Sequence, residues 1–259
     1  RGMGRSYGDA ALNEGGGLIL TDRIRRFLSF NSITGIVTCE AGMTLGKILQ
    51  VLVPQGWFLP VTPGTKIVTI AGAVACDVHG KNHHVDGSIS NFVLGLDLLL
   101  ANGRFLSCSR EENADLFWAT LGGMGLTGMI LAVTLSLRRI DSAFIQVDYQ
   151  RTKDLDETMT LLEDQDKQHT YSVAWVDGLA SGRHLGRGVL IHGDHASSQD
   201  LSGRQRLAPF NFNHRCSWNV PFQFPDFVLN RLSIGAFNSL YYRRFQGNCS
   251  GAIVDYDRF

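Results

Sequence analysis

Segments rich in glycine and other small residues lie in the first half of the chain, where they could hold a ligand. The first is Arg1–Asp9, which reads RGMGRSYGD and sets closely spaced glycines beside arginine and serine. Glycine lets a backbone approach a ligand closely, and successive N–H groups of such a loop can converge on a diphosphate. The segment is a candidate phosphate-binding loop, although an ordinary turn fits it equally well.

A Rossmann dinucleotide-binding loop is the main alternative interpretation of this segment. That loop needs a third glycine followed by a crossover helix. Here Tyr7 stands at the third glycine position, and Gly8–Gly17 is too rich in glycine to form the helix. Asp22 lies at the distance at which a Rossmann unit places its acidic residue, but the other two departures speak against that fold.

Three further segments share this small-residue character: Pro60–Thr65, Thr69–Gly80 and Gly122–Gly128. Small residues let a backbone lie against a flat ring system or a pyrophosphate, while close packing of a strand against a turn explains them without any ligand. The last segment lacks the Gly-Lys-Ser/Thr ending of a P-loop. It is typical of a further loop whose backbone closely approaches a ligand or another part of the chain.

Residues 79–84 read HGKNHH and place three histidines and a lysine together. No acidic or cysteine ligand stands at zinc spacing beside them, so we expect no metal. Polar contacts with a cofactor and an anionic substrate suit this segment better. For His83 and His84 individually, a structural or surface role is the simpler interpretation.

Composition restricts the class of protein. The 259 residues are 44% hydrophobic and carry no net charge, which indicates a globular protein and argues against nucleic-acid binding. No apolar run reaches the roughly 18 residues of a membrane span. Because the chain starts without methionine inside a motif, we expect it to be a fragment of a longer chain. Its cysteines are scattered and odd in number, which favours free thiols in a reduced compartment: Cys39, Cys76, Cys108, Cys216 and Cys249.

The pattern of apolar residues predicts an α+β fold. A helix is expected after Thr44, which can cap it, with Pro54 and Gly56 ending it. A capping box of Ser109 and Glu112 predicts a second helix, which carries Ala114, Phe117, Trp118 and Leu121 on one face. Strands are expected over Gly35–Glu40, Phe92–Leu100 and Met129–Leu137, with a hairpin turn at Asn102–Gly103.

Beyond about residue 140 glycine becomes sparse, and we place a domain boundary there. A helix is expected from Asp154, with Leu155, Met159 and Leu162 on one side, and a strand over Tyr171–Val176. The segment from Pro209 to Phe259 is aromatic and irregular. It could cover an apolar tail of a substrate or act as a lid, and ordinary core packing explains it as well: Phe210, Phe212, Trp218, Phe222, Phe224, Phe227, Tyr241 and Tyr242.

Taken together, four strings make the chain resemble the FAD-binding domain of the vanillyl-alcohol-oxidase (PCMH-type) superfamily, and within it the oxidases of polyprenylphosphoryl pentoses. The strings are RGMGRSYGD at 1–9, PGT at 63–65, TIAGAVACDVHGKNHH at 69–84 and ADLFWATLGGMGLTG at 114–128. The resemblance implies an FAD-binding domain over 1–141, without its N-terminal strand. It also implies that 142–259 is part of an α+β substrate or cap domain.

The resemblance also implies roles for individual residues. Family members that bond flavin covalently use a histidine just before the serine of the first loop; Arg5 stands there, so we expect non-covalent FAD. Val173 replaces the serine of the nearest family members, which leaves the substrate open. The residues expected to bind the cofactor are Arg1, Gly2, Gly4, Arg5, Ser6, Gly8, Gly64, Thr69, Ile70, Ala71, Gly72, Cys76, Asp77, Val78, His79 and Ile130.

The implied activity is oxidation of a secondary alcohol of a sugar, the 2′-hydroxyl of a polyprenylphosphoryl pentose, by hydride transfer to flavin. His79 would act on the hydroxyl, Lys81 would offset a substrate phosphate and Tyr7 would shape the ring pocket; a core histidine, a solvated lysine and a packed tyrosine are the structural alternatives.

Expected partners are a sugar or lipid-linked sugar substrate and an NAD-dependent reductase that completes an epimerisation. The chain would lie in the cytoplasm or at the cell envelope, with peripheral membrane association left open and no nucleic acid. Two other functions fit the same residues: an aldonolactone or alditol oxidase, and a nucleotide-binding module without catalysis.

Overall fold

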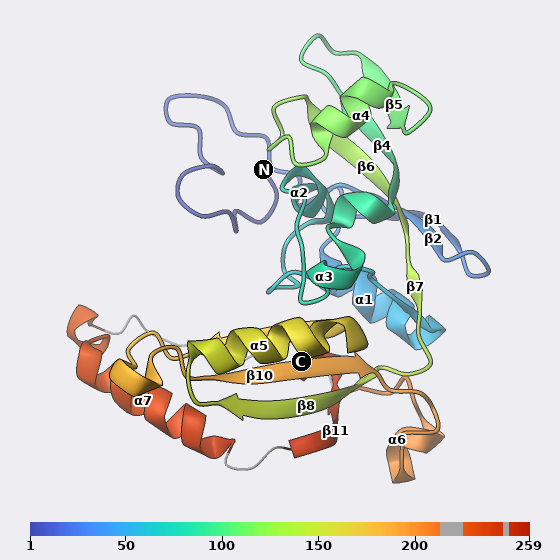
Figure 1. Ribbon diagram of the computed structural model, residues 1–259. Helices are drawn as coiled ribbons and strands as arrows, with labels where there is room; N and C mark the ends of the chain where they lie inside the picture. Colours follow the sequence, from blue (N-terminus) through green and yellow to red (C-terminus); the bar gives the residue numbers. More distant parts are fainter. Residues whose placement is uncertain (213–224, 246–248) are drawn as a thin grey trace. The chain divides into compact units, whose positions relative to one another are not determined.

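The computed structural model describes residues 1–212, 225–245 and 249–259 (Figure 1). These residues form two compact units, Arg1–Ile140 and Asp141–Phe259. The division lies one residue from the domain boundary that the sequence predicts. Both units combine helices with antiparallel strands, which confirms the α+β class.

The first unit is built on a five-stranded sheet with the strand order β1-β2-β6-β4-β5. All its neighbouring strands pair antiparallel. Gly103 adopts a left-handed φ of 81° in the turn between β4 and β5, as the Asn-Gly signal predicts. The strands are β1 (Phe27–Asn31), β2 (Ile36–Glu40), β4 (Val93–Leu99), β5 (Phe105–Ser109) and β6 (Met129–Ser136), with a separate pair of β3 (Trp57–Phe58) and β7 (Arg138–Arg139).

Two threonines start two helices of this unit. Thr44 Oγ1 accepts a hydrogen bond from the N–H of Lys47 at the start of α1 (Leu45–Leu52), and Thr69 does the same for Gly72 in α2 (Ile70–Ala75). A side-chain acceptor of this kind satisfies an N–H group that the helix leaves without a partner. The core contains the apolar faces of α1 and α2 and the inner side of the sheet: Val37, Leu45, Ile48, Leu52, Ile70, Leu98 and Leu135.

The predicted capping box of the next helix is wrong. Helix α4 spans Ala114–Thr120 and begins after Asn113, whose side chain does not cap it. Ser109 is the last residue of β5, and its hydroxyl accepts from the N–H groups of Glu111 and Glu112. The serine therefore closes a turn between the strand and the helix, because β5 extends as far as Ser109.

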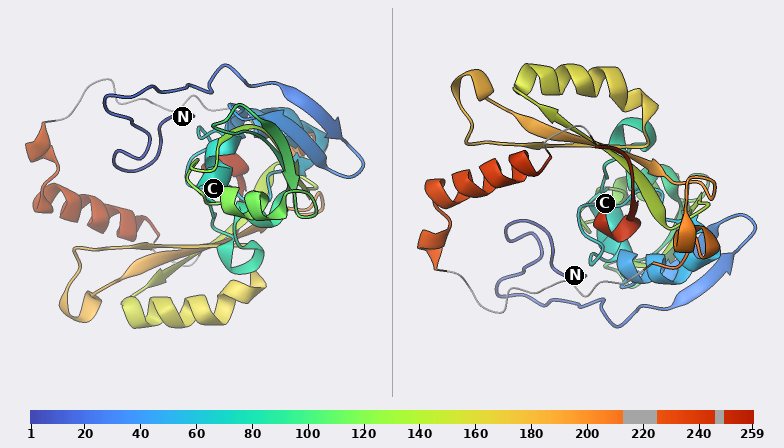
Figure 2. Two further views of the ribbon diagram at one scale, coloured as in Figure 1. Left: turned by 90° about the horizontal axis from the view of Figure 1, so that it is seen from above. Right: turned by 90° about the horizontal axis from the view of Figure 1, so that it is seen from below.

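The second unit contains a four-stranded antiparallel sheet in the order β11-β8-β10-β9. Figures 1 and 2 show α5 (Leu155–Gln165) on one face of this sheet and α7 (Arg231–Arg244) across the other. A short helix α6 spans Gly203–Leu207. The strands are β8 (Phe144–Thr152), β9 (Tyr171–Val176), β10 (Gly188–His195) and β11 (Cys249–Asp255).

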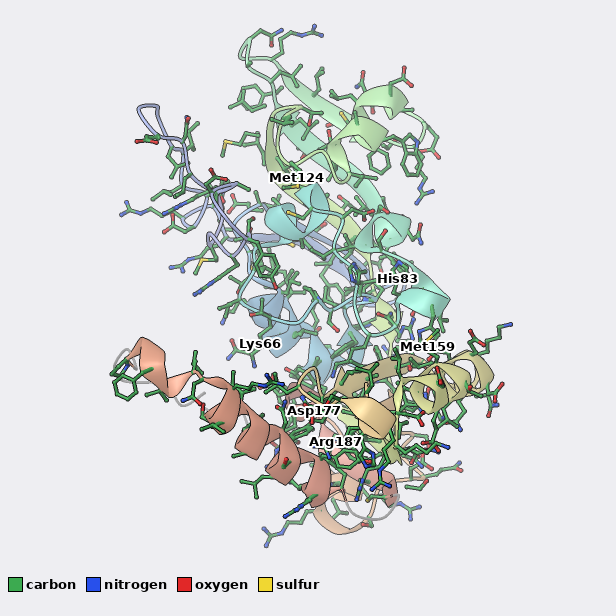
Figure 3. The ribbon with its side chains drawn as sticks, turned by 60° about the vertical axis from the view of Figure 1, so that its left-hand side comes forward. Lys66, His83, Met124, Met159, Asp177 and Arg187 are labelled. Atoms are coloured by element: carbon green, nitrogen blue, oxygen red, sulfur yellow. The ribbon has the colours of Figure 1, made fainter. Side chains whose placement is uncertain are left out.

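Helix α5 packs through a polar residue. The helix begins after Asp154 as predicted, and the Asp154 side chain caps it. Leu155 and Met159 are exposed, and Figure 3 shows Met159 on the outer side of the helix. The buried residue is Thr158, whose hydroxyl lies 2.6 Å from that of Thr152 on β8. The hydrogen bond satisfies both buried hydroxyls, so this helix does not need a continuous apolar face.

Several aromatic residues of the C-terminal segment pack on the sheet. Tyr241 of α7 contacts Trp175 of β9, and Phe245, directly after the helix, stacks on Tyr149 of β8. These partly buried aromatics pack against the strands, while Phe227 is exposed. Trp218, Phe222, Phe224 and Cys216 lie outside the described residues, and the other four cysteines are free thiols.

Candidate functional site

A cavity of about 1020 Å³ opens in the first unit. Its walls come from Arg1–Tyr7, Pro63–Thr65, helix α2 and the segment Met124–Ile130. A volume of this size is at the upper end of the range for ligand pockets, which suits an extended molecule such as a dinucleotide. Four segments that are distant in the sequence therefore meet around one space.

The first wall offers backbone donors and positive charge. Within the described residues, the N–H groups of residues 2–7 donate no hydrogen bond to the protein. Arg1 and Arg5 are the only charged residues among those that line this cavity. The loop is held at its start, because Arg1 O accepts from both the N–H and the hydroxyl of Thr21. Free donors beside two guanidinium groups fit a diphosphate.

Glycines determine how close the walls come to one another and to a guest. A Cβ atom at Gly2 would lie 2.2 Å from Thr69 Oγ1, so only glycine allows the loop to rest on the start of α2. By contrast, a Cβ at Gly64 or Gly125 would meet no atom within 4 Å. Because both glycines line the cavity, their missing side chains leave room for a flat ligand against bare backbone.

The loop after α4 completes the cavity. Met124 and Gly125 have left-handed φ angles of 53° and 79°. The N–H of Met124 donates to Ala75 O at the end of α2, at 2.8 Å, and the N–H of Gly122 donates to Val74 O, at 3.1 Å. These bonds satisfy carbonyls that the helix end leaves open, and they fix the loop beside α2.

Comparison with known proteins agrees with this geometry. Residues 1–109 match the family described as FAD binding domain. The decaprenylphosphoryl-beta-D-ribose oxidase of Mycolicibacterium smegmatis is 38% identical over 247 residues, which are 94% of this chain and 54% of that protein. The first part of the chain is therefore similar to FAD-binding domains. This finding confirms the PCMH-type resemblance and the FAD cofactor that the sequence predicts.

Shorter matches join the chain to relatives with other names. The mitochondrial D-2-hydroxyglutarate dehydrogenase of Bos taurus is 32% identical over 46% of this chain and 23% of that protein. The Delta(24)-sterol reductase of Homo sapiens is 30% identical over 39% of this chain and 20% of that protein. The chain spans about half the length of the Mycolicibacterium relative and less of these two.

Most of the residues predicted to bind FAD line the cavity. Met124, Gly125 and Gly128 also line it; the sequence did not predict them as cofactor residues, although the density of glycine marks their loop. The predicted residues that line it are Arg1, Gly2, Gly4, Arg5, Ser6, Gly64, Thr69, Ala71, Gly72, Cys76, Val78 and Ile130.

Four predicted cofactor residues do not line the cavity: Gly8, Ile70, Asp77 and His79. Ile70 is fully buried in the core. The carboxylate of Asp77 accepts from the Ser88 hydroxyl and from the N–H of Ser90, at 2.9 and 3.0 Å. The side chain of Asp77 therefore holds the chain after α3 (His83–Asp86) in place.

The three catalytic candidates occupy different surroundings. Tyr7 lines the FAD cavity and is fully exposed, which excludes the packed-tyrosine alternative. His79 is exposed at a strand bridge with Ser88, so it is not a core histidine. Lys81 is half-buried, and burial lowers the pKa of its ammonium group. The structure brings Tyr7 alone of the three to the cavity wall.

The described residues contain no group of three or more histidine, cysteine, aspartate or glutamate side chains placed to hold a metal ion. Within the same part of the chain, no helix combines the length and the apolar character that crossing a membrane requires. The short helix α3 carries His83 and His84 on the surface, where both side chains are exposed.

Proposed function

We propose that this chain belongs to an FAD-dependent oxidoreductase that oxidises a secondary alcohol of a sugar, the 2′-hydroxyl of a polyprenylphosphoryl pentose. The observation that carries the proposal is the large, glycine-rich cavity in a chain that is 38% identical over 94% of its length to a decaprenylphosphoryl-beta-D-ribose oxidase. Relatives in the same family carry the names of dehydrogenases and reductases, so redox chemistry on a carbon centre is their common element.

The residues of this chain would bind and orient FAD without a covalent bond. The N–H groups of residues 2–7, with Arg1 and Arg5, hold the diphosphate. Gly64, Gly125 and α2 leave space for the flat parts of the molecule. Arg5 stands at the position of the covalent histidine of other family members and cannot form that bond. When bound, FAD supplies the hydride acceptor.

The chain would also handle the charge and the proton of the substrate. Tyr7 lines the cavity and is free to pack against the substrate or the ring system. His79 is the proposed acceptor of the hydroxyl proton at a ring nitrogen, since a neutral imidazole has a nitrogen that can accept a proton. Lys81 is the proposed partner of a substrate phosphate, because a desolvated ammonium group gains from a nearby anion.

Anaerobic reduction of the purified full-length protein tests this activity. A prenylphosphoryl ribose should bleach the flavin absorption bands, and an aldonolactone or alditol should not. Bleaching by the small sugars alone would instead identify an aldonolactone or alditol oxidase, and no bleaching by any sugar would leave a nucleotide-binding module. Acid precipitation should release the flavin into the supernatant if it is held without a covalent bond.

The roles of His79 and Lys81 need separate variants. His79→Ala should slow flavin reduction about 100-fold or more, as expected for loss of a general base. A Lys81→Met variant should raise the KM for the phosphorylated substrate and leave kcat nearly unchanged. His84→Ala is the matched control for the histidine, because it lies on the surface of the same segment. A normal reduction rate in His79→Ala would remove that residue from the mechanism.

An NAD-dependent reductase that acts on the keto product is the proposed partner, because reduction from the opposite face would complete an epimerisation. Mixing the two proteins with substrate and NADH should give the epimeric alcohol, whereas the oxidase alone should give only the ketone. We propose that the protein works in the cytoplasm or at the cell envelope, where it meets a lipid-linked sugar. Fractionation of cells that express the full-length protein tests this location.

A further inference from the structure

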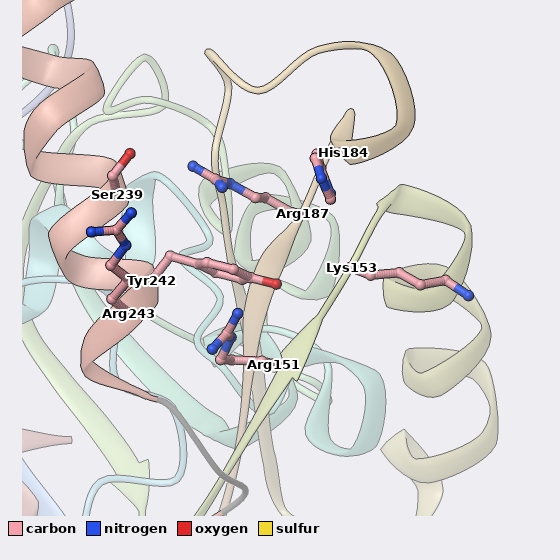
Figure 4. Close-up of a pocket in the computed structure, with 7 residues that line it drawn as sticks. All are labelled: Arg151, Lys153, His184, Arg187, Ser239, Tyr242 and Arg243. Atoms are coloured by element: carbon pink, nitrogen blue, oxygen red, sulfur yellow. The ribbon is translucent and has the colours of Figure 1, made fainter.

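The second unit contains a smaller cavity of about 430 Å³ with a strongly cationic wall (Figure 4). Five of its seven lining residues carry or can carry positive charge, and none is a carboxylate. The wall comes from β8, the turn before β10 and helix α7, so it belongs entirely to the second unit. Its residues are Arg151, Lys153, His184, Arg187, Ser239, Tyr242 and Arg243.

Tyr242 forms the centre of this cavity. Its hydroxyl donates to Thr152 O at 3.0 Å, which fixes the ring against the end of β8. The guanidinium carbon of Arg151 lies 3.9 Å from the ring centroid and that of Arg187 lies 4.8 Å from it. Figure 4 shows the two groups on opposite sides of the ring. Stacking of this kind holds arginine side chains in a fixed geometry before a ligand arrives.

Only one of these arginines has its charge balanced. Asp177 and Arg187 are labelled in Figure 3; Asp177 accepts two bonds from Arg187, at 3.0 and 2.8 Å. It accepts a third from Asn238. Within the described residues, Arg151 and Arg243 make no ion pair with a carboxylate. The cavity therefore retains an excess of positive charge, although the whole chain has none. An anion is the ligand that this excess favours.

We propose that the cavity is a binding site for a phosphoryl group. Guanidinium groups match the oxygens of a phosphate with paired N–H donors, and three of them around one space suit a group that has several charged oxygens better than a single carboxylate. The Ser239 hydroxyl adds a neutral donor to the same wall. This site would be separate from FAD binding, and it stands on the geometry of the second unit alone.

Titration of the full-length, flavin-loaded protein with inorganic phosphate and with geranyl phosphate tests the site. Arg151→Gln and Arg243→Gln should each weaken phosphate binding about tenfold, the loss expected for one charge-assisted pair. Arg204→Gln on α6 is the matched control, since this exposed arginine of the same unit does not line the cavity. Arg151→Lys should recover only part of the affinity, because lysine keeps the charge but not the planar fork.

The two probes separate the sources of the phosphoryl group. Tighter binding of geranyl phosphate, with the same loss in both variants, would indicate a lipid-borne phosphate; equal binding would indicate a soluble phosphate ester. Flavin content and thermal melting show whether each variant is folded. If Arg151→Gln unfolds, Arg243→Gln tests the site alone, because Arg243 is exposed on α7. The proposal is overturned if neither probe binds, or if the cavity variants bind as well as Arg204→Gln.

Discussion

The two cavities of this protein are built from different parts of the chain. The FAD cavity has a wall rich in small residues, in which twelve lining residues are glycine or alanine and only two are charged. The cavity of the second unit has walls of side chains, five of which can carry charge. The first recognises a ligand chiefly by shape and N–H groups. The second recognises charge, and its arginines depend on a buried carboxylate and an aromatic ring for their positions.

This difference determines which kinds of change each site tolerates. A backbone wall is insensitive to most substitutions of neighbouring side chains, but any added Cβ atom reduces the space. A side-chain wall is sensitive to the loss of each partner that positions a charge, because an unpaired buried charge costs several kcal/mol. Substitutions that add a side chain to the wall should therefore weaken FAD binding. Substitutions that remove a charge should reduce the stability of the second unit.

The largest effect is expected from Asp177→Ala. The Asp177 carboxylate is only 3% exposed, and burial would raise its pKa; the bonds from Arg187 and Asn238 outweigh that effect and hold the pKa below its usual value. The substitution leaves Arg187 and the buried Asn238 without this partner. We expect a loss of about 3 kcal/mol in the free energy of unfolding, measured by urea denaturation.

Asp200→Ala provides the control for that measurement. Asp200 also accepts hydrogen bonds, from Ser197, but it lies on the surface of the second unit. Its loss should cost less than about 1 kcal/mol. If the two variants are equally stable, burial of the Asp177 pair does not matter, and the proposed distinction between the two cavities loses its energetic basis.

The next effect concerns the FAD cavity. Gly64→Val adds a side chain where no protein atom lies within 4 Å, so the FAD-free protein should fold with unchanged stability. The same side chain occupies ligand space and should weaken FAD binding by about 10- to 100-fold. The flavin-to-protein ratio after gel filtration measures this loss. Gly178→Val is the control, because its added side chain also meets open space but lies outside the cavity.

The sequence predicted the FAD cavity better than the cavity of the second unit, because the two walls are built from different parts of the chain. Backbone walls come from contiguous motifs, so RGMGRSYGD and the small residues of Thr69–Gly80 could be recognised directly. The cationic cavity combines residues between positions 151 and 243, none of which stands out locally. Only the pairing of β8 with β10 and the packing of α7 bring Arg151, Arg187 and Arg243 together.

Local patterns failed where tertiary contacts decided the outcome. The start of α1 was predicted correctly because a capping threonine acts within four residues. The start of α4 was wrong because pairing in β5 extends to Ser109 and removes it from the helix. The sequence indicates an apolar side of α5 but does not predict that Leu155 and Met159 on it are exposed. The helix is oriented by the buried contact between Thr158 and Thr152, which depends on the neighbouring strand.

A third prediction concerns the pH dependence of stability that a buried histidine gives to the second unit. His192 on β10 is 2% exposed; burial lowers its pKa, and His169 nearby adds to the effect. Asp166, Asp148 and Asp194 act in the opposite direction without cancelling it. The unfolded chain therefore binds the proton more readily than the folded chain. The free energy of unfolding is not reduced by His192 above the unfolded pKa of about 6.5, and it decreases as the pH falls below that value.

The measurement is the urea midpoint between pH 7.5 and pH 5, a range about the pKa of unfolded histidine. His192→Asn should flatten the decrease toward low pH. His184→Asn is the control, because His184 is exposed and should leave the pH profile unchanged. If His192→Asn has the same profile as the original protein, burial of this histidine is not the source of the acid sensitivity.

The smallest effect is expected in α7, the helix that carries Tyr242 and Arg243. Gly235 lies within this helix, and a Cβ atom there would meet nothing within 4 Å. Gly235→Ala should stabilise the second unit by about 0.5 to 1 kcal/mol, because alanine loses less conformational freedom on entering a helix. A rise in the thermal midpoint with unchanged FAD content would show that the helix can be strengthened independently of the first cavity.

Phosphate affinity should also stay constant, since Gly235 does not line the cationic cavity. A loss of that affinity would mean that α7 must adjust to its ligand, and the arginines would then not be held in place beforehand.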